Sequence, residues 1–311
     1  MANRIAVIGL GIMGGAMAKN LVEKGFDVQG FDPADTARDR FAALGGHAAT
    51  SLESATRGAA LVLTSLPTAA ALHTVAGQLA DHALPGRVVI EVSTLSLADK
   101  EAAHVLLADA GAALLDCPVS GTGSQAASGD LTIFASGDPV AFDLAKPVLN
   151  AVARSVIFVG VFGGGSKLKF IANHLVTIHN AATAEALTLA RKADLDLNLV
   201  FDALKDSAAT SKMFQIRGPM VVERRYAPAM RISTYQKDLD IIGSFARDAR
   251  CPTPLFNICS QLYLSAQGLG LGELDTAAVA EVFETLAGLT SKDSPTGAQE
   301  STYRRAATGR S

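Results

Sequence analysis

The stretch Arg4-Ile5-Ala6-Val7-Ile8-Gly9-Leu10-Gly11-Ile12-Met13-Gly14 decides the fold. An apolar run typical of a buried strand leads into glycines spaced G-x-G-x-x-G, and a helical segment follows as far as Lys24. Gly9 permits a tight turn, Gly11 lets the backbone approach a bound group, and Gly14 lets helix and strand pack closely. The stretch therefore predicts the first strand–turn–helix unit of a parallel α/β sheet.

Short apolar runs recur through the first half of the chain, separated by helical or loop segments. Each run has the length of a buried strand. The predicted strands after the first are residues 27–31, 60–65, 87–92, 112–116, 131–135 and 155–159. This alternation of strand and crossover is typical of a largely parallel sheet covered by helices on both faces.

The sequence becomes helical throughout after the glycine cluster at 160–165. No proline or glycine interrupts the Ala- and Leu-rich residues from Ser166 to Lys192, which predicts one long helix. Further predicted helices are residues 198–207, 211–223, 234–248, 254–267 and 275–286. The fold class is thus α/β: a Rossmann-type, mostly parallel sheet domain joined by a long interdomain helix to an all-α domain. The predicted bounds are 1–163 for the nucleotide-binding domain, 164–295 for the all-α substrate and oligomerisation domain, and 296–311 for a flexible tail.

The composition restricts the classes of partner. The chain has 27 Lys and Arg against 30 Asp and Glu, so its net charge is −3. This charge argues against electrostatic binding to nucleic acid or anionic lipid. No run of about 18 apolar residues exists, so no transmembrane helix is expected. Cys117, Cys251 and Cys259 form neither a disulfide framework nor a zinc ligand set, which favours the reducing cytoplasm. No cluster of Asp, Glu, His or Cys suggests a metal.

Asp32 directly follows the second predicted strand, 18 positions after Gly14. An acid at this place accepts hydrogen bonds from the adenosine ribose hydroxyls and repels a 2′-phosphate, so the cofactor expected is NAD rather than NADP. The N–H groups at the start of the helix favour the phosphates of such a cofactor. The alternatives are a glycine turn without a ligand and, for Asp32, a role as a helix N-cap or turn residue before Pro33. The loop residues expected to bind the cofactor are Gly9, Leu10, Gly11, Ile12, Met13 and Gly14.

Two later segments carry candidate reacting groups. Residues 116–123 follow a strand, and the Ser120 hydroxyl with the N–H groups of a glycine-rich turn suits a carboxylate, although an ordinary tight loop explains the pattern equally well. Lys169 and Asn173 are spaced i and i+4, on one face of the long helix. A lysine acts as a general base when burial or neighbours lower its pKa. The alternative is a surface lysine, which is the expectation for Lys167.

With these motifs together, the chain resembles the β-hydroxyacid dehydrogenase family, which includes 3-hydroxyisobutyrate dehydrogenase and tartronate semialdehyde reductase. The resemblance covers nearly the whole chain. It rests on residues 9–21, on 116–121, on the G-x-x-G-x-G-x-x-x-K-x-x-x-N pattern of 160–173, and on Lys237-Asp238-Leu239. It implies an oxidoreductase that transfers a hydride between a small 3-hydroxy acid and NAD.

The resemblance also implies roles for single residues. Lys169 corresponds to the catalytic acid/base and Asn173 to its helper. Ser120 and Gly121 correspond to the groups that bind the substrate carboxylate, and Lys237 to a second lysine at the nicotinamide end of the cofactor. The residues that match cofactor-lining segments of the family are Leu66, Pro67 and Thr94.

Three departures from the family pattern limit what can be transferred. Thr122 stands where the family usually has a second glycine, and a side chain there narrows the substrate pocket or contacts the substrate. Leu97 replaces the proline that usually ends the stretch beginning at Ser93. The related 6-phosphogluconate dehydrogenases carry a histidine where this chain has Ala172, which counts against decarboxylation of a sugar phosphate.

Two other functions stay open from the sequence. One is an NAD(P)H-dependent reductase of a small aldehyde acid such as succinic semialdehyde or glyoxylate, which is the same chemistry in reverse. The other is a non-catalytic nucleotide-binding homologue, although such members, like imine reductases, lack the lysine that this chain has at Lys169. The apolar surface of the long helix predicts a homodimer or homotetramer.

Overall fold

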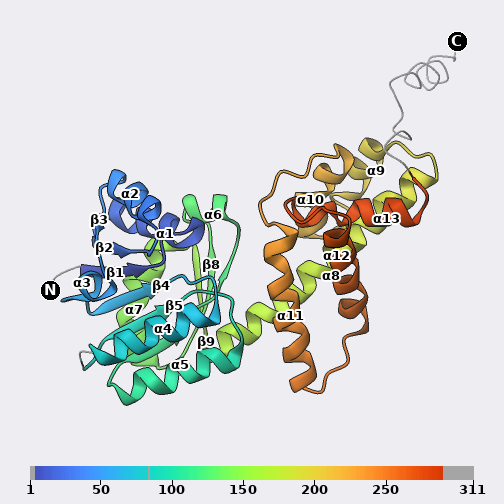
Figure 1. Ribbon diagram of the computed structural model, residues 1–311. Helices are drawn as coiled ribbons and strands as arrows, with labels where there is room; N and C mark the ends of the chain where they lie inside the picture. Colours follow the sequence, from blue (N-terminus) through green and yellow to red (C-terminus); the bar gives the residue numbers. More distant parts are fainter. Residues whose placement is uncertain (1–3, 83–84, 290–311) are drawn as a thin grey trace, which may run out of the picture. The chain divides into compact units, whose positions relative to one another are not determined.

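The computed structural model describes residues 4–82 and 85–289 (Figure 1). The chain forms two compact units. Unit 1 comprises Met1–Leu175 with Lys237–Thr253, and unit 2 comprises Val176–Gln236 with Pro254–Ser311. The domain bounds of 163 and 164 stay a prediction, and the tail over 296–311 lies outside the described residues. Among the described helices, none combines the length and the apolar character needed to cross a membrane.

Unit 1 is built on one mostly parallel sheet, as the alternating sequence pattern predicts. Within the described residues the strand order is β3-β2-β1-β4-β5-β6-β8-β7, and β9 pairs with β8. The strands are β1 (Arg4–Ile8), β2 (Asp27–Phe31), β3 (His47–Ala48), β4 (Leu61–Thr64), β5 (Val88–Glu91), β6 (Ala113–Asp116), β7 (Val119–Ser120), β8 (Thr132–Ser136) and β9 (Ser155–Gly160). Strands β1 to β6 pair in parallel, whereas β8 runs antiparallel to β6 and β7. The two-residue strands β3 and β7 were not predicted because they are too short for a periodicity.

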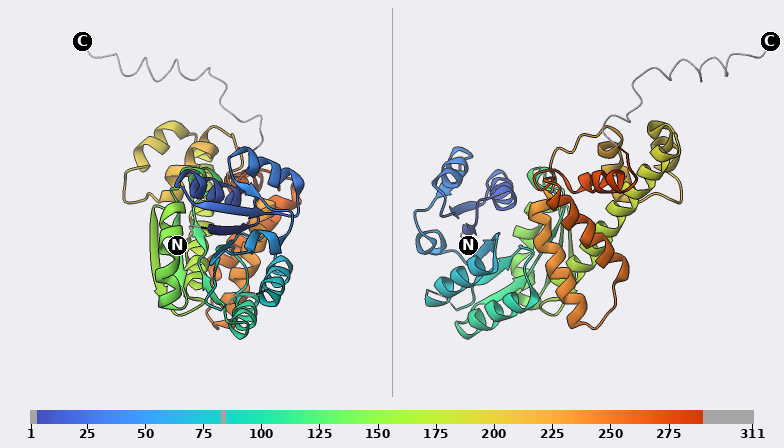
Figure 2. Two further views of the ribbon diagram at one scale, coloured as in Figure 1. Left: turned by 90° about the vertical axis from the view of Figure 1, so that its left-hand side faces the viewer. Right: turned by 45° about the vertical axis from the view of Figure 1, so that its right-hand side comes forward.

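Helices cover both faces of this sheet. They are α1 (Ile12–Glu23), α2 (Asp35–Ala43), α3 (Leu52–Thr56), α4 (Ala69–Asp81), α5 (Leu97–Asp109), α6 (Gly123–Ala127) and α7 (Pro139–Val152). Successive strand side chains point to opposite faces, so Ile5 and Val7 join a core with α1, α2 and α7, whereas Ala6 and Ile8 join a core with α3, α4 and α5. Figure 2 shows α4 and α5 side by side along the sheet. The first strand is therefore buried on both faces, which explains its continuous apolar run.

The rest of the described chain is helical. It contains α8 (Gly164–Lys192), α9 (Leu197–Leu204), α10 (Lys212–Val222), α11 (Ile232–Asp248), α12 (Pro254–Gly268), the 3-10 helix η1 (Thr276–Val279) and α13 (Ala280–Leu286). Both α8 and α11 have residues in each unit. The long helix begins at Gly164, two residues before the predicted start, because the N–H groups of Gly165 and Ser166 find side-chain acceptors in Ser136 and Asp116.

Buried ion pairs, as well as apolar packing, join the helices of unit 2 to one another. Arg217 donates to the fully buried Asp275 over 3.0 Å, and the other oxygen of Asp275 accepts the N–H groups of Ala229 and Met230. Arg191 pairs with Glu284 at 2.7 Å. A buried carboxylate that accepts several hydrogen bonds fixes the segments that donate them.

Candidate active site

The predicted cofactor residues follow the carboxyl ends of neighbouring strands. Gly9 follows β1 and Asp32 follows β2, while Leu66 and Thr94 come after β4 and β5. These four strands are adjacent and parallel. Their carboxyl ends therefore meet at one edge of the sheet, which is where open α/β sheets bind ligands.

The glycine loop has the geometry that the spacing predicts. Gly9 has φ +90°, and a Cβ there would lie 2.1 Å from the carbonyl oxygen of Ser65. A Cβ at Gly14 would lie 2.0 Å from the carbonyl oxygen of Gly9, so helix α1 and strand β1 meet without room for a side chain. Gly11 is different, because among the described residues no heavy atom lies within 4 Å of a Cβ built there. As the N-cap of α1, Gly11 also has no side chain to engage the first-turn N–H groups. The loop thus offers open backbone donors to an anion.

Asp32 is half-buried and holds the glycine loop in place. Its Oδ2 accepts the N–H of Leu10 over 2.9 Å, and its Oδ1 accepts the N–H of Ala34 over 2.8 Å. Asp32 therefore has the turn role considered from the sequence, whereas the N-cap of α2 is Ala34 and not Asp32. Since each carboxylate oxygen can accept a second hydrogen bond, the same side chain can also receive ribose hydroxyls.

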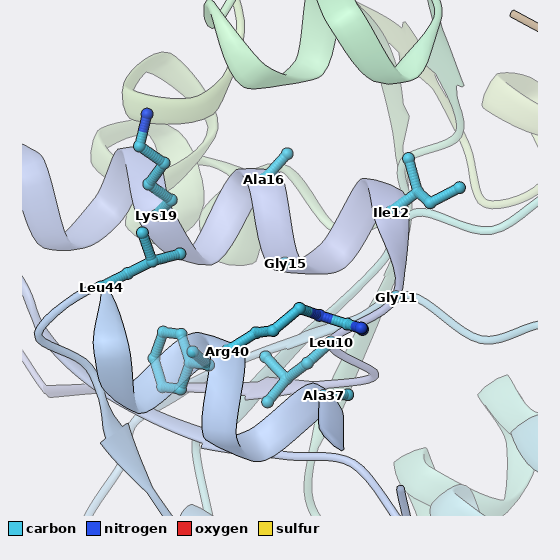
Figure 3. Close-up of a pocket in the computed structure, with 10 residues that line it drawn as sticks. Leu10, Gly11, Ile12, Gly15, Ala16, Lys19, Ala37, Arg40 and Leu44 are labelled. Atoms are coloured by element: carbon cyan, nitrogen blue, oxygen red, sulfur yellow. The ribbon is translucent and has the colours of Figure 1, made fainter. Parts of the chain in front are cut away.

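A pocket adjoins the glycine loop between α1 and α2 (Figure 3). Its lining residues are Leu10, Gly11, Ile12, Gly15, Ala16, Lys19, Ala37, Arg40, Phe41 and Leu44. In Figure 3 the exposed side chain of Arg40 extends from α2 toward Gly11. Arg40 therefore brings positive charge to the pocket beside the loop.

Lys169 is a buried lysine on the second turn of α8, only 9% exposed, whereas Lys167 is exposed. Burial lowers the pKa of Lys169 to about 8; the carboxylate of Asp238 opposes this shift, and the ammonium of Lys237 adds to it. An amine with this pKa is present in both protonation states near neutral pH. The geometry therefore excludes the surface-lysine alternative for Lys169 and gives this position the properties of an acid/base group.

Two of the predicted residues, Asn173 and Lys237, contact the carboxylate of Asp238, whose charge also acts on Lys169. Asn173, one turn along α8, donates its Nδ2 to Asp238 Oδ2 over 3.1 Å. The Nζ of Lys237 lies 3.2 Å from Asp238 Oδ1 and also donates to the carbonyl oxygen of Thr94, after β5. The sequence pattern contained Asp238 without giving it a role; its position beside Lys237 was the signal. In the structure, the Asp238 carboxylate joins Asn173 of α8 to Lys237 of α11.

The predicted substrate loop lies at the end of β7. Ser120 ends this strand, Gly121 follows with φ +142°, and Thr122 is the N-cap of α6. The Thr122 hydroxyl accepts the N–H of Gln125, and the Gln125 side chain accepts the N–H of Thr122 over 3.0 Å. The Thr122 side chain thus caps helix α6, and this role explains why a residue with a hydroxyl stands here in place of glycine. Its contact with substrate, and those of Ser120 and Gly121, stay predictions.

Within residues 4–82 and 85–289, no three or more His, Cys, Asp or Glu side chains are grouped so as to hold a metal ion. The polar groups near Lys169 are instead paired with one another, as described above for Asn173, Lys237 and Asp238. Chemically, the arrangement connects an amine that can exchange a proton, Lys169, with the predicted cofactor edge of the sheet, since Lys237 of the same cluster donates to the Thr94 carbonyl.

Two family descriptions together match most of the chain. Residues 4–160 match the NAD binding domain of 6-phosphogluconate dehydrogenase. Residues 163–283 match the family described as NAD-binding of NADP-dependent 3-hydroxyisobutyrate dehydrogenase.

Individual relatives match over nearly their whole length. An L-threonate dehydrogenase of Cupriavidus necator is 35% identical over 91% of this chain and 97% of its own. An NAD-dependent L-serine dehydrogenase of Pseudomonas aeruginosa is 31% identical over 92% of this chain and 99% of its own. Among solved structures, 3-hydroxyisobutyrate dehydrogenase from Salmonella typhimurium is similar with a TM-score of 0.81 and 33% identity, covering 90% of this chain and 99% of that one. The Mycobacterium tuberculosis enzyme of the same name, solved with L-serine, gives a TM-score of 0.84 and 30% identity, covering 92% and 99%.

Proposed function

This chain belongs to the β-hydroxyacid dehydrogenase family, and we propose that within this family Lys169 is its catalytic acid/base. The protein is an NAD(P)-dependent oxidoreductase that acts on the CH–OH group of a small hydroxy acid. The observation that carries the proposal is a buried amine with a pKa of about 8, set among charged groups that also contact a cofactor-lining segment.

The glycine loop and the strand ends are the proposed cofactor site. When bound, NAD supplies a nicotinamide ring that accepts the hydride from the carbinol carbon. The first-turn N–H groups of α1, from Ile12 and Met13, bind its pyrophosphate, and Asp32 binds the adenosine ribose. Leu66, Pro67 and Thr94 line the site, and Lys237 holds the Thr94 carbonyl in place.

Lys169 moves the proton. In oxidation its neutral amine takes the proton of the substrate hydroxyl, and in reduction its ammonium returns that proton to the carbonyl oxygen. Asn173 shares Asp238 with Lys237, so its amide is fixed where it can orient the hydroxyl. The Ser120 hydroxyl and the N–H of Gly121 bind the substrate carboxylate.

Charge variants beside Lys169 should move its pKa in opposite directions. Asp238→Asn removes a charge that raises the pKa, whereas Lys237→Met removes one that lowers it. In the oxidation direction we expect the pH of half-maximal kcat/KM to fall in the first variant and to rise in the second. Asp240→Asn, an exposed neighbour on α11, is the matched control and should leave the midpoint unchanged. Shifts of both midpoints in one direction would rule out the assigned electrostatics.

We propose NAD as the preferred cofactor because the carboxylate of Asp32 repels a 2′-phosphate. Asp32→Asn keeps an acceptor for the Leu10 N–H but removes the charge. We expect the ratio of kcat/KM with NAD to kcat/KM with NADP to fall by roughly tenfold or more, equivalent to about 1.4 kcal/mol. Steady-state rates with both cofactors test this. An unchanged ratio would show that Asp32 does not determine the preference for NAD over NADP. Arg40 would then be the next residue to replace.

The proposed substrates are hydroxy carboxylates of three to five carbons, with L-threonate first because a relative 35% identical is an L-threonate dehydrogenase. The test is NADH formation with a panel of L-threonate, L-serine, 3-hydroxyisobutyrate and their stereoisomers. Reduction of an aldehyde acid such as glyoxylate is the reverse reaction and belongs in the same panel. If no acid in the panel reacts with NAD or NADP, the proposed activity is wrong.

We also propose a homodimer or homotetramer located in the cytoplasm. Ile171, Leu175 and Leu189 on α8 are exposed apolar residues, as expected of a helix covered by a second copy. The three cysteines are free thiols in the structure, which suits a reducing compartment. Light scattering on the purified protein tests the first proposal, and cell fractionation tests the second.

A further inference from the structure

Three charged side chains are completely enclosed at the carboxyl ends of β5 and β6. Lys100 of α5 lies 2.6 Å from Glu91 Oε2 and 2.8 Å from Asp116 Oδ1, and the side chains of all three have 0% exposure. Burial by itself would lower the pKa of Lys100, but the two carboxylates outweigh burial and hold that pKa above its ordinary value. The cluster therefore keeps a buried ammonium. None of its members has a role in the proton transfer proposed above.

One end of this cluster is the first turn of α8. Asp116 Oδ2 accepts the N–H of Ser166 over 2.7 Å, and Oδ1 accepts the Ser166 hydroxyl over 2.7 Å. Ser136 contributes a further acceptor for the N–H of Gly165 at 2.9 Å. Lys169 follows Ser166 by three residues on the same helix. Because a helix moves as a rigid rod over one turn, the position of Ser166 sets that of Lys169.

The other end of the cluster is the cofactor-lining edge. Glu91 Oε1 accepts the N–H of Ser93 over 2.9 Å. The Ser93 hydroxyl in turn accepts the N–H of Leu66 over 2.7 Å. A continuous set of hydrogen bonds and ion pairs therefore runs from Leu66, through Glu91 and Lys100, to the start of α8.

The amino-terminal end of α8 adds to the electrostatics of the cluster. Two acidic side chains surround one ammonium in the interior, and one of them, Asp116, also meets the start of α8. The amino-terminal end of α8 carries a partial positive charge and supplies the N–H that Asp116 accepts. A buried ion pair adds little stability compared with apolar residues of similar volume, whereas its geometry is specific.

From this connectivity we propose that Lys100 is a positioning residue, which fixes the first turn of α8, and with it Lys169, relative to the cofactor-lining segment at Leu66 and Ser93. It contacts neither substrate nor cofactor. The proposal rests on the proposed role of Lys169 but adds a residue that sets its place. Without Lys100, the Asp116 side chain still caps α8 but loses its link to the Glu91 side chain. The two residues then remain connected through the backbone pairing of β5 and β6, in which the Cys117 N–H donates to the Glu91 carbonyl over 2.8 Å.

The main test is the double variant Glu91→Gln with Lys100→Met, because it removes one charge of each sign and leaves the Asp116 cap intact. We expect kcat with L-threonate and NAD to fall by about 10- to 100-fold, since small misplacements of a reacting group have effects of this size. The Kd for NADH should change by less than about threefold, because the glycine loop is untouched. Lys100→Arg in the parent keeps the cation and should retain more of kcat than the double variant. Lys146→Met, an exposed lysine of α7, is the matched control and should behave as the parent.

A readout without substrate separates this inference from the proposed function. Hydrogen exchange at the amides of residues 165–170, measured by mass spectrometry, should be faster in the double variant than in the parent and the Lys146→Met control. If the double variant does not fold, Ser166→Ala removes one bond between α8 and Asp116 and should change the same amides and lower kcat. Unchanged exchange in a folded variant, or a kcat within twofold of the parent, would overturn the positioning role. Failure of the parent to oxidise any acid would instead concern the proposed function, and exchange alone would then decide the inference.

Discussion

We expect Lys169→Met to lower kcat for hydroxy-acid oxidation by about 10²- to 10⁴-fold, the usual contribution of a positioned acid/base group. Methionine is close to lysine in length and resembles its apolar methylene chain. It therefore fills the buried space without a titrating group. The glycine loop and Asp32 are untouched, so the Kd for NADH should stay near that of the parent. Stopped-flow rates together with a fluorescence titration of NADH measure both quantities.

The neighbouring Lys167 is a matched control for this variant. It lies on the same helix turn, but its side chain is exposed. Lys167→Met should therefore keep the parent's kcat. Added small primary amines should restore part of the rate of the Lys169 variant, because they supply the missing base. A Lys169→Met enzyme with at least half the parent's kcat would show that another group moves the proton.

Gly14→Ala should have the second large effect, on both stability and cofactor binding. A Cβ at Gly14 would lie 2.0 Å from the Gly9 carbonyl oxygen and 2.9 Å from Ser65 Cβ, so the backbone itself must shift. Forced overpacking of this kind costs about 1–3 kcal/mol or more of unfolding free energy. For a unit of this size the melting temperature should fall by roughly 2–4 °C per kcal/mol. The Kd for NADH should rise at least tenfold, because α1 and its N–H groups are displaced from the loop.

Gly11→Ala separates packing from ligand contact in the same loop. No described heavy atom lies within 4 Å of a Cβ at Gly11, so the melting temperature should stay within about 2 °C of the parent's. The Kd for NADH should nevertheless rise, since the methyl group occupies the space through which the pyrophosphate approaches. Equal losses of stability in the two variants would contradict the steric distinction between them. Calorimetry and NADH titration on the same samples provide the comparison.

The sequence predicted those features that depend on local pattern. The buried strands of a parallel sheet are continuous apolar runs, so β1, β2 and β4 to β6 could be recognised with ends within a residue or two. The long helix α8 was predictable from an uninterrupted helical composition. The i, i+4 spacing placed Lys169 and Asn173 on one helix face, and the structure finds both buried.

Features that depend on pairing across the fold could not be predicted. Glu91, Lys100 and Asp116 have no spacing that marks them as partners, because they come from two strands and a helix. Their burial follows from the way α5 packs on the sheet, which is a tertiary property. Asp238 was visible only as a neighbour of Lys237, and its bond to Asn173 required α11 to lie against α8, where Phe170 and Phe245 also meet at 5.4 Å. The sequence predicted a loop where the short helix α6 forms. The role of Thr122 as the N-cap of this helix therefore could not be predicted.

The pH dependence of kcat/KM in both directions tests the central claim about Lys169 most directly. Oxidation needs the neutral amine, so its kcat/KM should rise with pH and level off above a midpoint near the pKa of about 8. Reduction needs the ammonium, so its kcat/KM should be constant at low pH and fall above the same midpoint. The residual rate of Lys169→Met should lose this titration in both directions. Profiles that lack opposite slopes around a shared midpoint, or a titration that persists in Lys169→Met, would contradict the assignment of Lys169 as the acid/base.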